Sequence, residues 1–231
     1  MKFPDFRFER KLWRKGYKII AGVDEVGRGC FAGPVVAGCV IFSPNSKFKI
    51  HNLEVRIDDS KRMTARQREK AEKWIKENAL SWGIGEVPTT LINRSGMGKA
   101  TKAAFRKAIK SANLKLKMNK SLRDKNLKLD FLLADAFFIS YVPGLPRRRR
   151  QLAIIDGDQK SFSIAAASII AKVYRDKLML CLSKKSKFKK YGWGRNKGYG
   201  TKEHQKAIKK YGITRYHRKQ FVATFLGSLK S

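Results

Sequence analysis

Two apolar runs within residues 19–42 are joined by a glycine-rich turn, and the first of them ends in two adjacent acids, Asp24 and Glu25. Short apolar runs bounded by glycines are typical of buried β-strands. An ionised carboxylate at the end of a buried strand loses hydration unless another charge replaces the water. Hard divalent cations such as Mg²⁺ select carboxylate oxygens and keep positions open for water and phosphate. We therefore expect a metal site of the nuclease type, with a solvated strand edge as the alternative.

The glycines of this turn invite a second interpretation. Gly27, Gly29 and Gly33 resemble a stretched form of the G-x-G-x-x-G fingerprint that binds dinucleotides. That fingerprint must open a helix, whereas residues 34–42 continue as a second apolar strand. We therefore expect a tight turn between two strands and no dinucleotide site.

The charge of the chain restricts its partners. The 231 residues, of which 42% are hydrophobic, suffice for one domain with a substantial core. With 53 Lys and Arg against 18 Asp and Glu, the formal net charge is +35, which implies a polyanionic partner such as nucleic acid. A ribosome-associated or membrane-surface protein would be basic in the same way. The charge therefore indicates a surface that binds polyanions, but it does not indicate whether the protein catalyses a reaction.

Membrane and zinc signals are absent from the sequence. No apolar run reaches the roughly 18–20 residues of a membrane span, and the N-terminus lacks the apolar core of a signal peptide. Cys30, Cys39 and Cys181 are widely spaced, and no C-x-x-C or H-x-x-x-H pair exists, so we expect no structural zinc. Three unpaired thiols fit a reducing compartment. We expect a cytoplasmic protein.

The predicted elements follow an α/β order. Thr64 and Gln67 form a capping box that predicts a helix over 64–79. Further elements are expected as strands over 80–87, 127–134 and 152–155, a helix or helix pair after Thr89 and Thr90, and a buried helix containing 164–171. Residues 113–128 are lysine-rich and weakly patterned, which predicts a solvated loop or extension.

Two more acids repeat the placement of Asp24. Asp135 stands at the end of the predicted strand 127–134. Asp158 comes just before the buried helix, where the helix dipole and a bound cation both favour the ionised carboxylate.

Five sequence blocks occur in an order that resembles the ribonuclease HII family, the type 2 ribonucleases H. The blocks are AGVDEVGRGCFAGPVVAG at 21–38, DDSK at 58–61, LLADAF at 132–137, GDQKSFSIAAASIIAKVYRDKLM at 157–179 and NKGYGTKEH at 196–204. The resemblance extends from about residue 17 to about residue 225. It implies an α/β, ribonuclease H-like fold with a central five-stranded mixed sheet flanked by helices and a C-terminal helical portion.

The resemblance also implies how the chain is divided. We expect a basic N-terminal segment over 1–16, a catalytic core over 17–182, and a basic loop with a C-terminal helical region of the same domain over 183–231. The sister type, ribonuclease HIII, carries a long N-terminal extension that has no counterpart before residue 17. This difference favours the HII type.

Four carboxylates carry the chemistry that the resemblance implies. They are the catalytic and metal-binding acids of the family, at positions Asp24, Glu25, Asp135 and Asp158. The expected cofactor is Mg²⁺ or Mn²⁺ in a two-metal mechanism, in which the cations orient the water and neutralise charge on the phosphoryl and leaving oxygens. Without metal, acids so close together would repel one another.

Substrate contacts are implied at three further places. The turn Gly27, Arg28 and Gly29 corresponds to the family's sensor of the ribonucleotide, because glycines allow the main chain to approach a 2′-hydroxyl closely. Tyr199 corresponds to the ring that packs on the neighbouring deoxyribose. Lys61 is a candidate for contact with the nucleic-acid backbone, and its DDSK block could equally serve only to shape a loop.

The activity that the resemblance implies is hydrolysis of the RNA strand of RNA–DNA hybrids, with cutting 5′ to single ribonucleotides embedded in duplex DNA. The products would be a 3′-hydroxyl and a 5′-phosphate. The expected partners are these hybrids and ribonucleotide-containing DNA duplexes, without a membrane, and the expected state is a monomer. The alternative is a non-catalytic basic nucleic-acid-binding protein of the same fold, which explains the charge of +35 but not the four acids.

Basic segments provide secondary predictions. The run 147–150 and the stretch 184–197 are expected to hold phosphates. Phe188, Tyr191 and Trp193, which alternate with lysines in the second stretch, are predicted to pack on sugars or bases.

Four other residues receive structural roles. Asp176 is predicted to form a salt bridge or to support the metal ligands, with direct metal binding as the alternative, and His204 and His217 are predicted to be structural. Ala136 stands where many members of the family have glycine, and we expect this difference to be tolerated.

Overall fold

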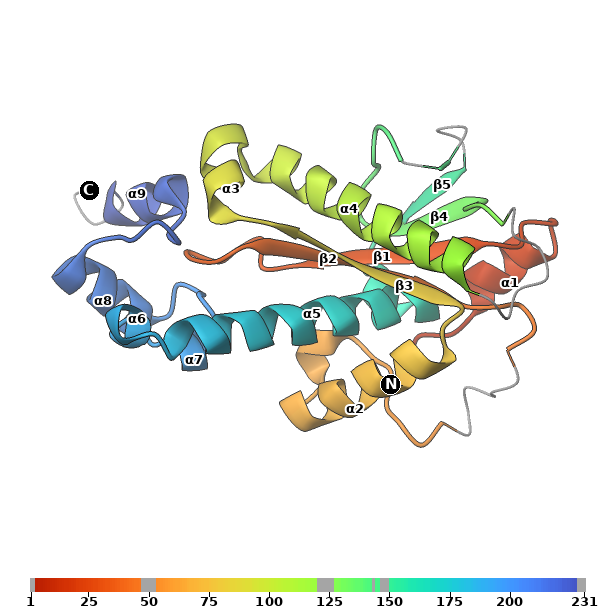
Figure 1. Cartoon of the computed structure of the whole chain (residues 1–231), viewed down its shortest axis with the longest axis horizontal. Coiled ribbons are helices and arrows are strands. Elements are labelled where there is room, and N and C mark those ends of the chain that lie inside the picture. The colour runs from red at the N-terminus through yellow and green to blue at the C-terminus, as the bar shows by residue number, and fades with distance from the viewer. Residues whose placement is uncertain (1–2, 47–52, 120–126, 143, 146–149, 228–231) are drawn as a thin grey trace.

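The computed structural model describes residues 3–46, 53–119, 127–142, 144–145 and 150–227. Its centre is a five-stranded mixed sheet in the order β3-β2-β1-β4-β5 (Figure 1). The strands are β1 (Ile20–Val26), β2 (Val35–Ile41), β3 (Ser81–Val87), β4 (Phe131–Asp135) and β5 (Gln151–Ile154). β2 runs antiparallel to both β1 and β3, whereas β4 runs parallel to both β1 and β5. The predicted fold is confirmed.

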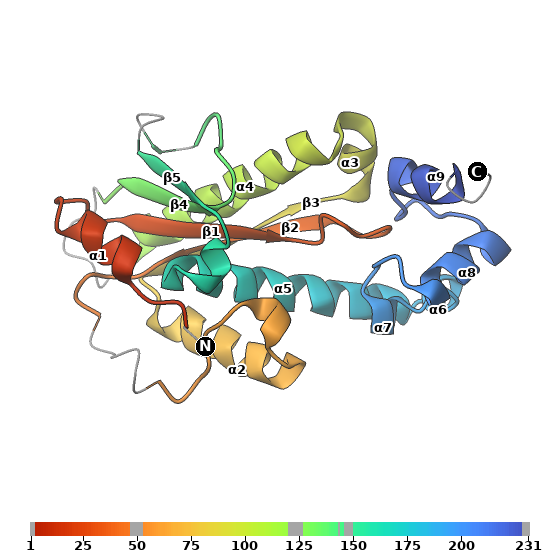
Figure 2. The same ribbon diagram turned by 180° about the vertical axis from the view of Figure 1, so that it is seen from behind.

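Helices cover both faces of this sheet. The α-helices are α1 (Arg7–Trp13), α2 (Ala65–Asn78), α3 (Thr89–Ser95), α4 (Met97–Met118), α5 (Phe162–Ser183), α6 (Ser186–Lys189), α7 (Trp193–Asn196), α8 (Lys202–Tyr211) and α9 (Lys219–Gly227), and the short 3₁₀ turns are η2 (Ser60–Arg62) and η3 (Gly157–Gln159). α4 lies on one face and α5 on the other, with α2 outside α5 (Figures 1 and 2). α6 to α9 gather at the end to which the β1–β2 turn points.

Glycines bring both helices unusually close to the sheet. Gly22 and Gly38 face α5, and Gly83 and Gly85 face α4. A Cβ atom on Gly38 would lie 2.2 Å from the carbonyl oxygen of Ala167, well inside van der Waals contact. These positions therefore fix how near each helix can approach, and α5 in turn brings the segment before it to the ends of β1 and β4.

α4 is longer than the sequence pattern predicts. The lysine-rich residues 113–118 belong to the helix, so the loop prediction is wrong for this part, and residues 120–126 lie outside the described chain. Leu116 is buried one helical turn after Ala112 and continues the apolar stripe. Lys115 and Lys117 occupy the last turn, where the helix dipole favours cations. The predicted strand over 127–134 is likewise shorter, because β4 begins only at 131.

The segment before β1 packs on the same core. The ring of Phe6 lies against Phe42 and Phe162, with ring centroids 5.6 and 4.6 Å apart. Glu9 of α1 is fully buried at the N-terminus of α5, where its carboxylate accepts hydrogen bonds from the Ser161 hydroxyl at 2.7 Å and the Ser163 amide at 3.0 Å. α1 thereby caps the helix that follows Asp158.

The aromatic residues of the stretch 184–197 are not on the surface. Phe188, Tyr191 and Trp193 are between 0 and 3% exposed and pack with Met179 and Leu182 in a core cluster of their own. The prediction that these rings pack on sugars or bases is therefore wrong. Alternation with lysine predicts a mixed surface, but the short helices α6 and α7 turn the rings inward and leave the lysines outside.

The two histidines belong to this cluster, in agreement with the structural role predicted for them. His204 and His217 are both fully buried. The indole nitrogen of Trp193 donates to Nε2 of His204 at 3.1 Å, and the two Nε2 atoms are 3.1 Å apart. Burial lowers the pKa of His217 to about 4, so the ring stays neutral and packs as an uncharged group.

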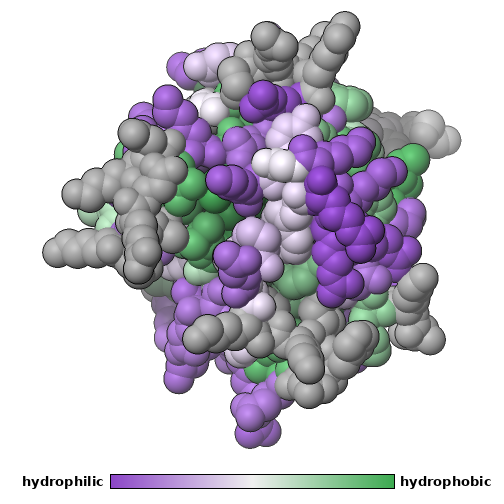
Figure 3. Space-filling model, turned by 90° about the vertical axis from the view of Figure 1, so that its right-hand side faces the viewer, coloured by the Kyte–Doolittle hydropathy of each residue, from purple (hydrophilic) through white to green (hydrophobic). Residues whose placement is uncertain are grey.

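The end of the molecule near α1 and the C-terminus of α4 carries many hydrophilic side chains with smaller apolar patches between them (Figure 3). Within the residues that the structure describes, no helix combines the length and the apolar character needed to cross a membrane.

Candidate active site

Asp24 and Asp135 lie side by side near the ends of β1 and β4. The parallel register of these strands brings the two residues level with each other. Gly22 packs on Ser163 of α5, and because side chains alternate along a strand, Asp24 points to the same face. The hydroxyl of Ser168 in α5 lowers the pKa of the Asp24 carboxyl, which is only 4% exposed. Two of the four predicted acids therefore meet beneath α5.

Asp158 reaches this place from the turn η3, just before α5. The amide of the preceding residue, Gly157, donates to Oδ1 of Asp135 at 2.7 Å and so ties η3 to the end of β4. The ammonium of Lys61 donates to Oδ2 of Asp158 at 3.3 Å while its side chain remains 78% exposed. Lys61 thus belongs to the site. Its neighbour Asp59 caps η2 by accepting from the Lys61 amide, so the DDSK block shapes the loop as well.

Glu25 points to the opposite face of β1 from Asp24, as strand alternation requires. Its Oε1 accepts a hydrogen bond from Arg28 at 3.4 Å, and its Oε2 is buried without a hydrogen-bond partner among the described residues. The guanidinium of Arg28 also lies over the ring of Phe137, 4.4 Å from its centroid. Phe137 therefore supports Arg28, one of the predicted substrate-binding residues. Nothing in the sequence pattern indicated that these two residues are in contact.

Burial and mutual repulsion raise the pKa of each acid. The pKa of Asp24 is well above its ordinary value because the side chain is buried and because Glu25, Asp135 and Asp158 repel its charge. Burial likewise raises the pKa of Glu25, against the opposing effect of Arg28, and that of Asp135. The pKa of Asp158 rises to about 6, mainly through burial, although Lys61 opposes the shift. The site holds more negative charge than its surroundings neutralise.

This donor set fits a divalent cation. Among the described residues, no three acid, histidine or cysteine side chains are yet arranged to enclose a metal ion. The unpaired Oε2 of Glu25 and the raised pKa values of Asp24, Asp135 and Asp158 show a concentration of negative charge that a divalent cation would balance. Carboxylate oxygens are the ligands that Mg²⁺ and Mn²⁺ prefer.

The turn after β1 lies against the loop that carries Tyr199. Gly27 has φ +89°, a left-handed conformation that favours glycine, and a Cβ atom there would lie 2.2 Å from Nε of Arg175. An isolated antiparallel bridge pairs Cys30 with Tyr199. The Tyr199 ring is 39% exposed. The structure thus brings the predicted ribonucleotide sensor and the predicted sugar-packing ring together.

Ala136 directly follows Asp135 in a left-handed conformation, with φ +53°. The Cβ atom of an L-residue makes this region costly, by about 1–2 kcal/mol, whereas glycine enters it freely. The alanine is tolerated because its amide donates to the carbonyl of Ile154 at 3.0 Å and holds the turn.

Replacing Ala136 with glycine should therefore stabilise the protein by about 0.5–1 kcal/mol, after the greater flexibility of glycine in the unfolded chain is deducted. The measurement is the free energy of unfolding in urea. The same replacement at Ala108, which is buried in the interior of α4, serves as the control and should destabilise the protein. Equal destabilisation by both changes would contradict the strain at position 136.

Asp176 takes the structural role predicted for it. Its carboxylate pairs with Lys172 at 2.8 Å and with Arg68 at 3.5 Å. Of the basic run 147–150, only Arg150 is described, and its guanidinium lies 5.7 Å from the ring centroid of Tyr17. Residues 147–149 lie outside the described chain.

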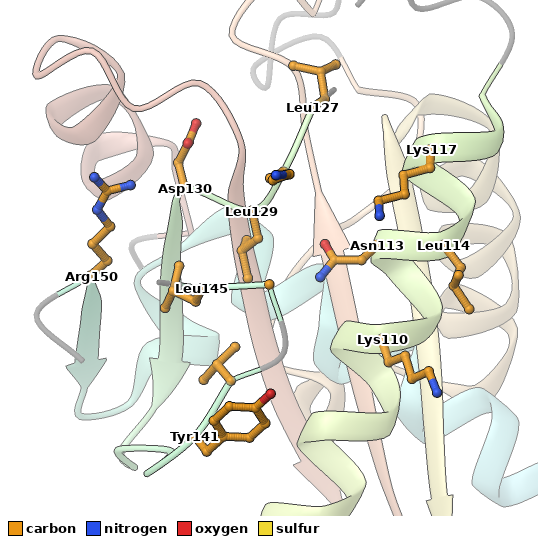
Figure 4. Close-up of a pocket in the computed structure, with 13 residues that line it drawn as sticks. Lys110, Asn113, Leu114, Lys117, Leu127, Leu129, Asp130, Tyr141, Leu145 and Arg150 are labelled. Atoms are coloured by element: carbon orange, nitrogen blue, oxygen red, sulfur yellow. The ribbon is translucent and has the colours of Figure 1, made fainter. Parts of the chain in front are cut away.

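A cavity of about 650 Å³ lies at the other end of β4 from Asp135 (Figure 4). Basic side chains from α4 and from the start of β5 surround it, among them Lys110, Lys117 and Arg150, over an apolar floor that includes Leu129. The four acids, Lys61, the residues of the turn 27–29 and Tyr199 are not among the described residues that line it. The candidate active site is therefore separate from this cavity.

The fold matches that of solved ribonucleases H. A crystal structure of ribonuclease H2 from Pyrococcus horikoshii superposes with a TM-score of 0.62 at 24% sequence identity, over 92% of this chain and 99% of that one. A crystal structure of Bst-RNase HIII in complex with Mn²⁺ gives a TM-score of 0.63 at 19% identity, over 91% of this chain and 70% of that one. This likeness shows that the chain has a ribonuclease H-like fold.

Sequence comparison narrows the class to one family. The family described as Ribonuclease HII matches residues 21–224. The Ribonuclease HII of Pelagibacter ubique (strain HTCC1062) is 46% identical over 204 residues, which cover 88% of this chain and 96% of that protein. The chain belongs to the ribonuclease HII family.

Proposed function

We propose that this ribonuclease H cuts the RNA strand of RNA–DNA hybrids and the bond 5′ to single ribonucleotides embedded in duplex DNA, with Mg²⁺ or Mn²⁺ as its cofactor. The ribonuclease HII family consists of endoribonucleases, and membership favours an enzyme over a non-catalytic binding protein. The observation that carries the proposal is that Asp135 and Asp158, joined through the Gly157 amide, lie near enough to Asp24 to repel its charge. We further propose that the enzyme acts as a monomer in the cytoplasm.

The four acids would hold the cations. Asp24 and Asp135 extend from two rigid strands, and Asp158 from a turn tied to β4, so three of the carboxylates come from elements of fixed relative position. Two divalent cations, when bound, supply neutralising charge for the phosphoryl oxygens and lower the pKa of the attacking water. Glu25 would use the oxygen that has no protein partner.

Cationic side chains at the rim would bind the strand that is cut. Lys61 keeps most of its side chain in solvent while its ammonium lies beside Asp158, so it can contact a phosphate next to the acids. Burial lowers the pKa of Lys61, but Asp158 and Asp59 outweigh this effect and raise it, so the ammonium stays charged. Arg28, held between Glu25 and the ring of Phe137, presents its guanidinium in a fixed direction.

Recognition of RNA would come from the turn and the tyrosine loop. A 2′-hydroxyl both donates and accepts hydrogen bonds, and main-chain groups of the turn can serve both needs. The exposed face of Tyr199 would pack on the sugar of the next nucleotide, where a ring favours a sugar without the 2′-oxygen.

Three labelled substrates test this function. They are a DNA duplex with one ribonucleotide, a fully hybrid RNA–DNA duplex and an all-DNA duplex, each incubated with Mg²⁺ or Mn²⁺. We expect one cut on the 5′ side of the single ribonucleotide, several cuts in the RNA of the hybrid and none in DNA. Cutting of the all-DNA duplex, or cutting of the hybrid alone, would contradict the proposed selectivity.

A further inference from the structure

Two fully buried arginines hold the turn after β1, and the mechanism above does not use them. Arg175 lies in α5 and Arg218 just before α9, and both side chains are 0% exposed. Within the described chain, neither forms an ion pair with a carboxylate. Among the described residues, the hydrogen bonds of the two guanidinium groups go instead to main-chain carbonyl oxygens.

Arg218 forms hydrogen bonds with both ends of the turn. Its Nη1 donates to the carbonyl oxygen of Arg28 at 2.7 Å. Its Nε and Nη2 donate to the carbonyl oxygen of Gly33 at 3.1 and 2.9 Å, and Nη2 also donates to that of Pro34 at 3.1 Å. One planar fork therefore joins the ribonucleotide-sensing residues to the start of β2.

Arg175 extends the same support to the tyrosine loop. Its Nε donates to the carbonyl oxygen of Pro34 and its Nη2 to that of Ala32, both at 3.0 Å. Its Nη1 donates to the carbonyl oxygen of Lys197 at 2.9 Å, two residues before Tyr199. The turn and the loop are thus fixed to each other through a rigid helix.

The bond to Arg28 determines where the next amide points. In a trans peptide unit, the carbonyl of one residue and the N–H of the next point in opposite directions. Because the carbonyl of Arg28 points at the buried Arg218, the N–H of Gly29 points away from the protein core. Among the described residues this N–H has no acceptor, and a Cβ atom on Gly29 would meet open space.

The energetics argue for a positional role. Taking two guanidinium groups out of water without carboxylate partners is costly, and apolar side chains would fill the same space more cheaply. Burial lowers the pKa of Arg218 to about 10, so the group still carries its charge and all its donors at neutral pH. Five donors spread over three nitrogens in a rigid plane can reach carbonyls of separate segments at once, whereas the three donors of lysine all start from one nitrogen.

We propose that Arg218 is a positioning residue for ribonucleotide recognition, which holds the peptide unit between Arg28 and Gly29 so that the Gly29 N–H faces the sugar of the bound strand. The inference rests on the proposed function of the turn. Arg218 itself touches no substrate and acts through the main chain that it orients.

The first test compares Arg218→Lys with the unchanged chain, each in an Asp24→Asn background so that bound duplexes are not cut. Dissociation constants are measured by fluorescence anisotropy for two duplexes of the same sequence, one with a single ribonucleotide and one all-DNA. One misdirected hydrogen bond should reduce the preference for the ribonucleotide about five- to tenfold. Affinity for the all-DNA duplex should stay within about twofold, because the charges that bind phosphates remain.

Leu116→Ala provides the matched control for lost stability. Leu116 is buried in α4, remote from the turn, and its truncation should lower the melting temperature while the preference for the ribonucleotide stays unchanged. An unchanged preference in the Arg218→Lys variant would overturn the inference. A parent protein that binds both duplexes equally would instead contradict the proposed function of the turn.

A second measurement needs no substitution at position 218. Amide hydrogen exchange of the otherwise unchanged Asp24→Asn protein should show a fast Gly29 N–H in the free state. Exchange should slow on binding of the ribonucleotide-containing duplex and slow less with the all-DNA duplex. A Gly29 amide that is already protected in the free protein would overturn the inference even if the Arg218→Lys variant does not fold.

Discussion

Replacing Asp24 with asparagine should abolish cleavage and at the same time make the metal-free protein more stable. The change removes one of the proposed metal ligands at the centre of the acid group, so we expect the rate to fall by about a thousandfold or more. It also removes a buried charge that three other acids repel. Few substitutions in a core raise the melting temperature, so the two results together would be specific to a functional acid.

The pH dependence of this stabilisation follows from the raised pKa of Asp24. A carboxyl whose pKa is higher in the folded than in the unfolded protein destabilises the folded state when it is ionised, and the penalty disappears once the folded state is protonated. The melting temperature of Asp24→Asn should thus exceed that of the unchanged chain at neutral pH. The difference should shrink as the pH falls through the raised pKa toward the ordinary value of an aspartate.

Asp176→Asn is the matched control for this experiment. Asp176 is an acid of α5 that lies among other charged side chains. It pairs with Lys172 and Arg68 and belongs to no metal site in our proposal. Its replacement should leave cleavage within a fewfold of the unchanged rate and should lower the melting temperature. Cleavage that survives in Asp24→Asn but is lost in Asp176→Asn would contradict our assignment of the acids.

Replacing Gly85 with alanine should cost most of the stability of the fold. A Cβ atom at this position would lie 2.1 Å from the carbonyl oxygen of Ala104 and 2.5 Å from the amide nitrogen of Ala108, both in the backbone of α4. A backbone cannot rotate away as a side chain can, so the whole helix must move off the sheet. We expect a loss of about 3 kcal/mol or more in the free energy of unfolding, at the upper end for overpacked cores.

Gly98→Ala is the control for the glycine experiment. Gly98 lies in the first turn of α4, and nothing lies within 4 Å of the position that its Cβ would take. Alanine is the better helix former, so this change should be neutral or stabilising by up to about 1 kcal/mol. Urea unfolding of both variants measures the effect, and a Gly85→Ala protein as stable as Gly98→Ala would contradict the close approach of α4.

Local signals in the sequence predicted the elements that carry the acids. The capping box of Thr64 and Gln67 is formed as expected, with the Thr64 hydroxyl accepting from the Gln67 amide at 3.2 Å. The strands that present Asp24 and Asp135 also lie where the apolar runs predicted them, within a few residues at each end. Strand ends and helix caps are determined mainly by residues adjacent in the chain, so they can be predicted from the sequence.

The sequence pattern did not predict contacts between segments that are distant in the chain. The ring of Phe137 under Arg28 and the carbonyl groups held by Arg218 involve residues about 110 to 190 positions apart in the chain, and no periodicity links them. The aromatic rings of α6 and α7 show the same difficulty, because alternation with lysine looks identical whether the rings face a ligand or a second core. Only the resemblance to a known family pointed to the turn and to Tyr199.

One helix connects the place where the sugar would be recognised with the place where the bond would break. The hydroxyl of Ser168 in α5 favours the ionised form of Asp24, and Arg175, seven residues later, donates to carbonyl oxygens of the turn. Seven residues are about two helical turns, so both side chains leave the same side of α5 about 10 Å apart along its axis. If the proposed roles of these residues hold, the fixed length of α5 would keep a constant distance between the nucleotide that is recognised and the linkage that is cut, whatever the sequence of the duplex.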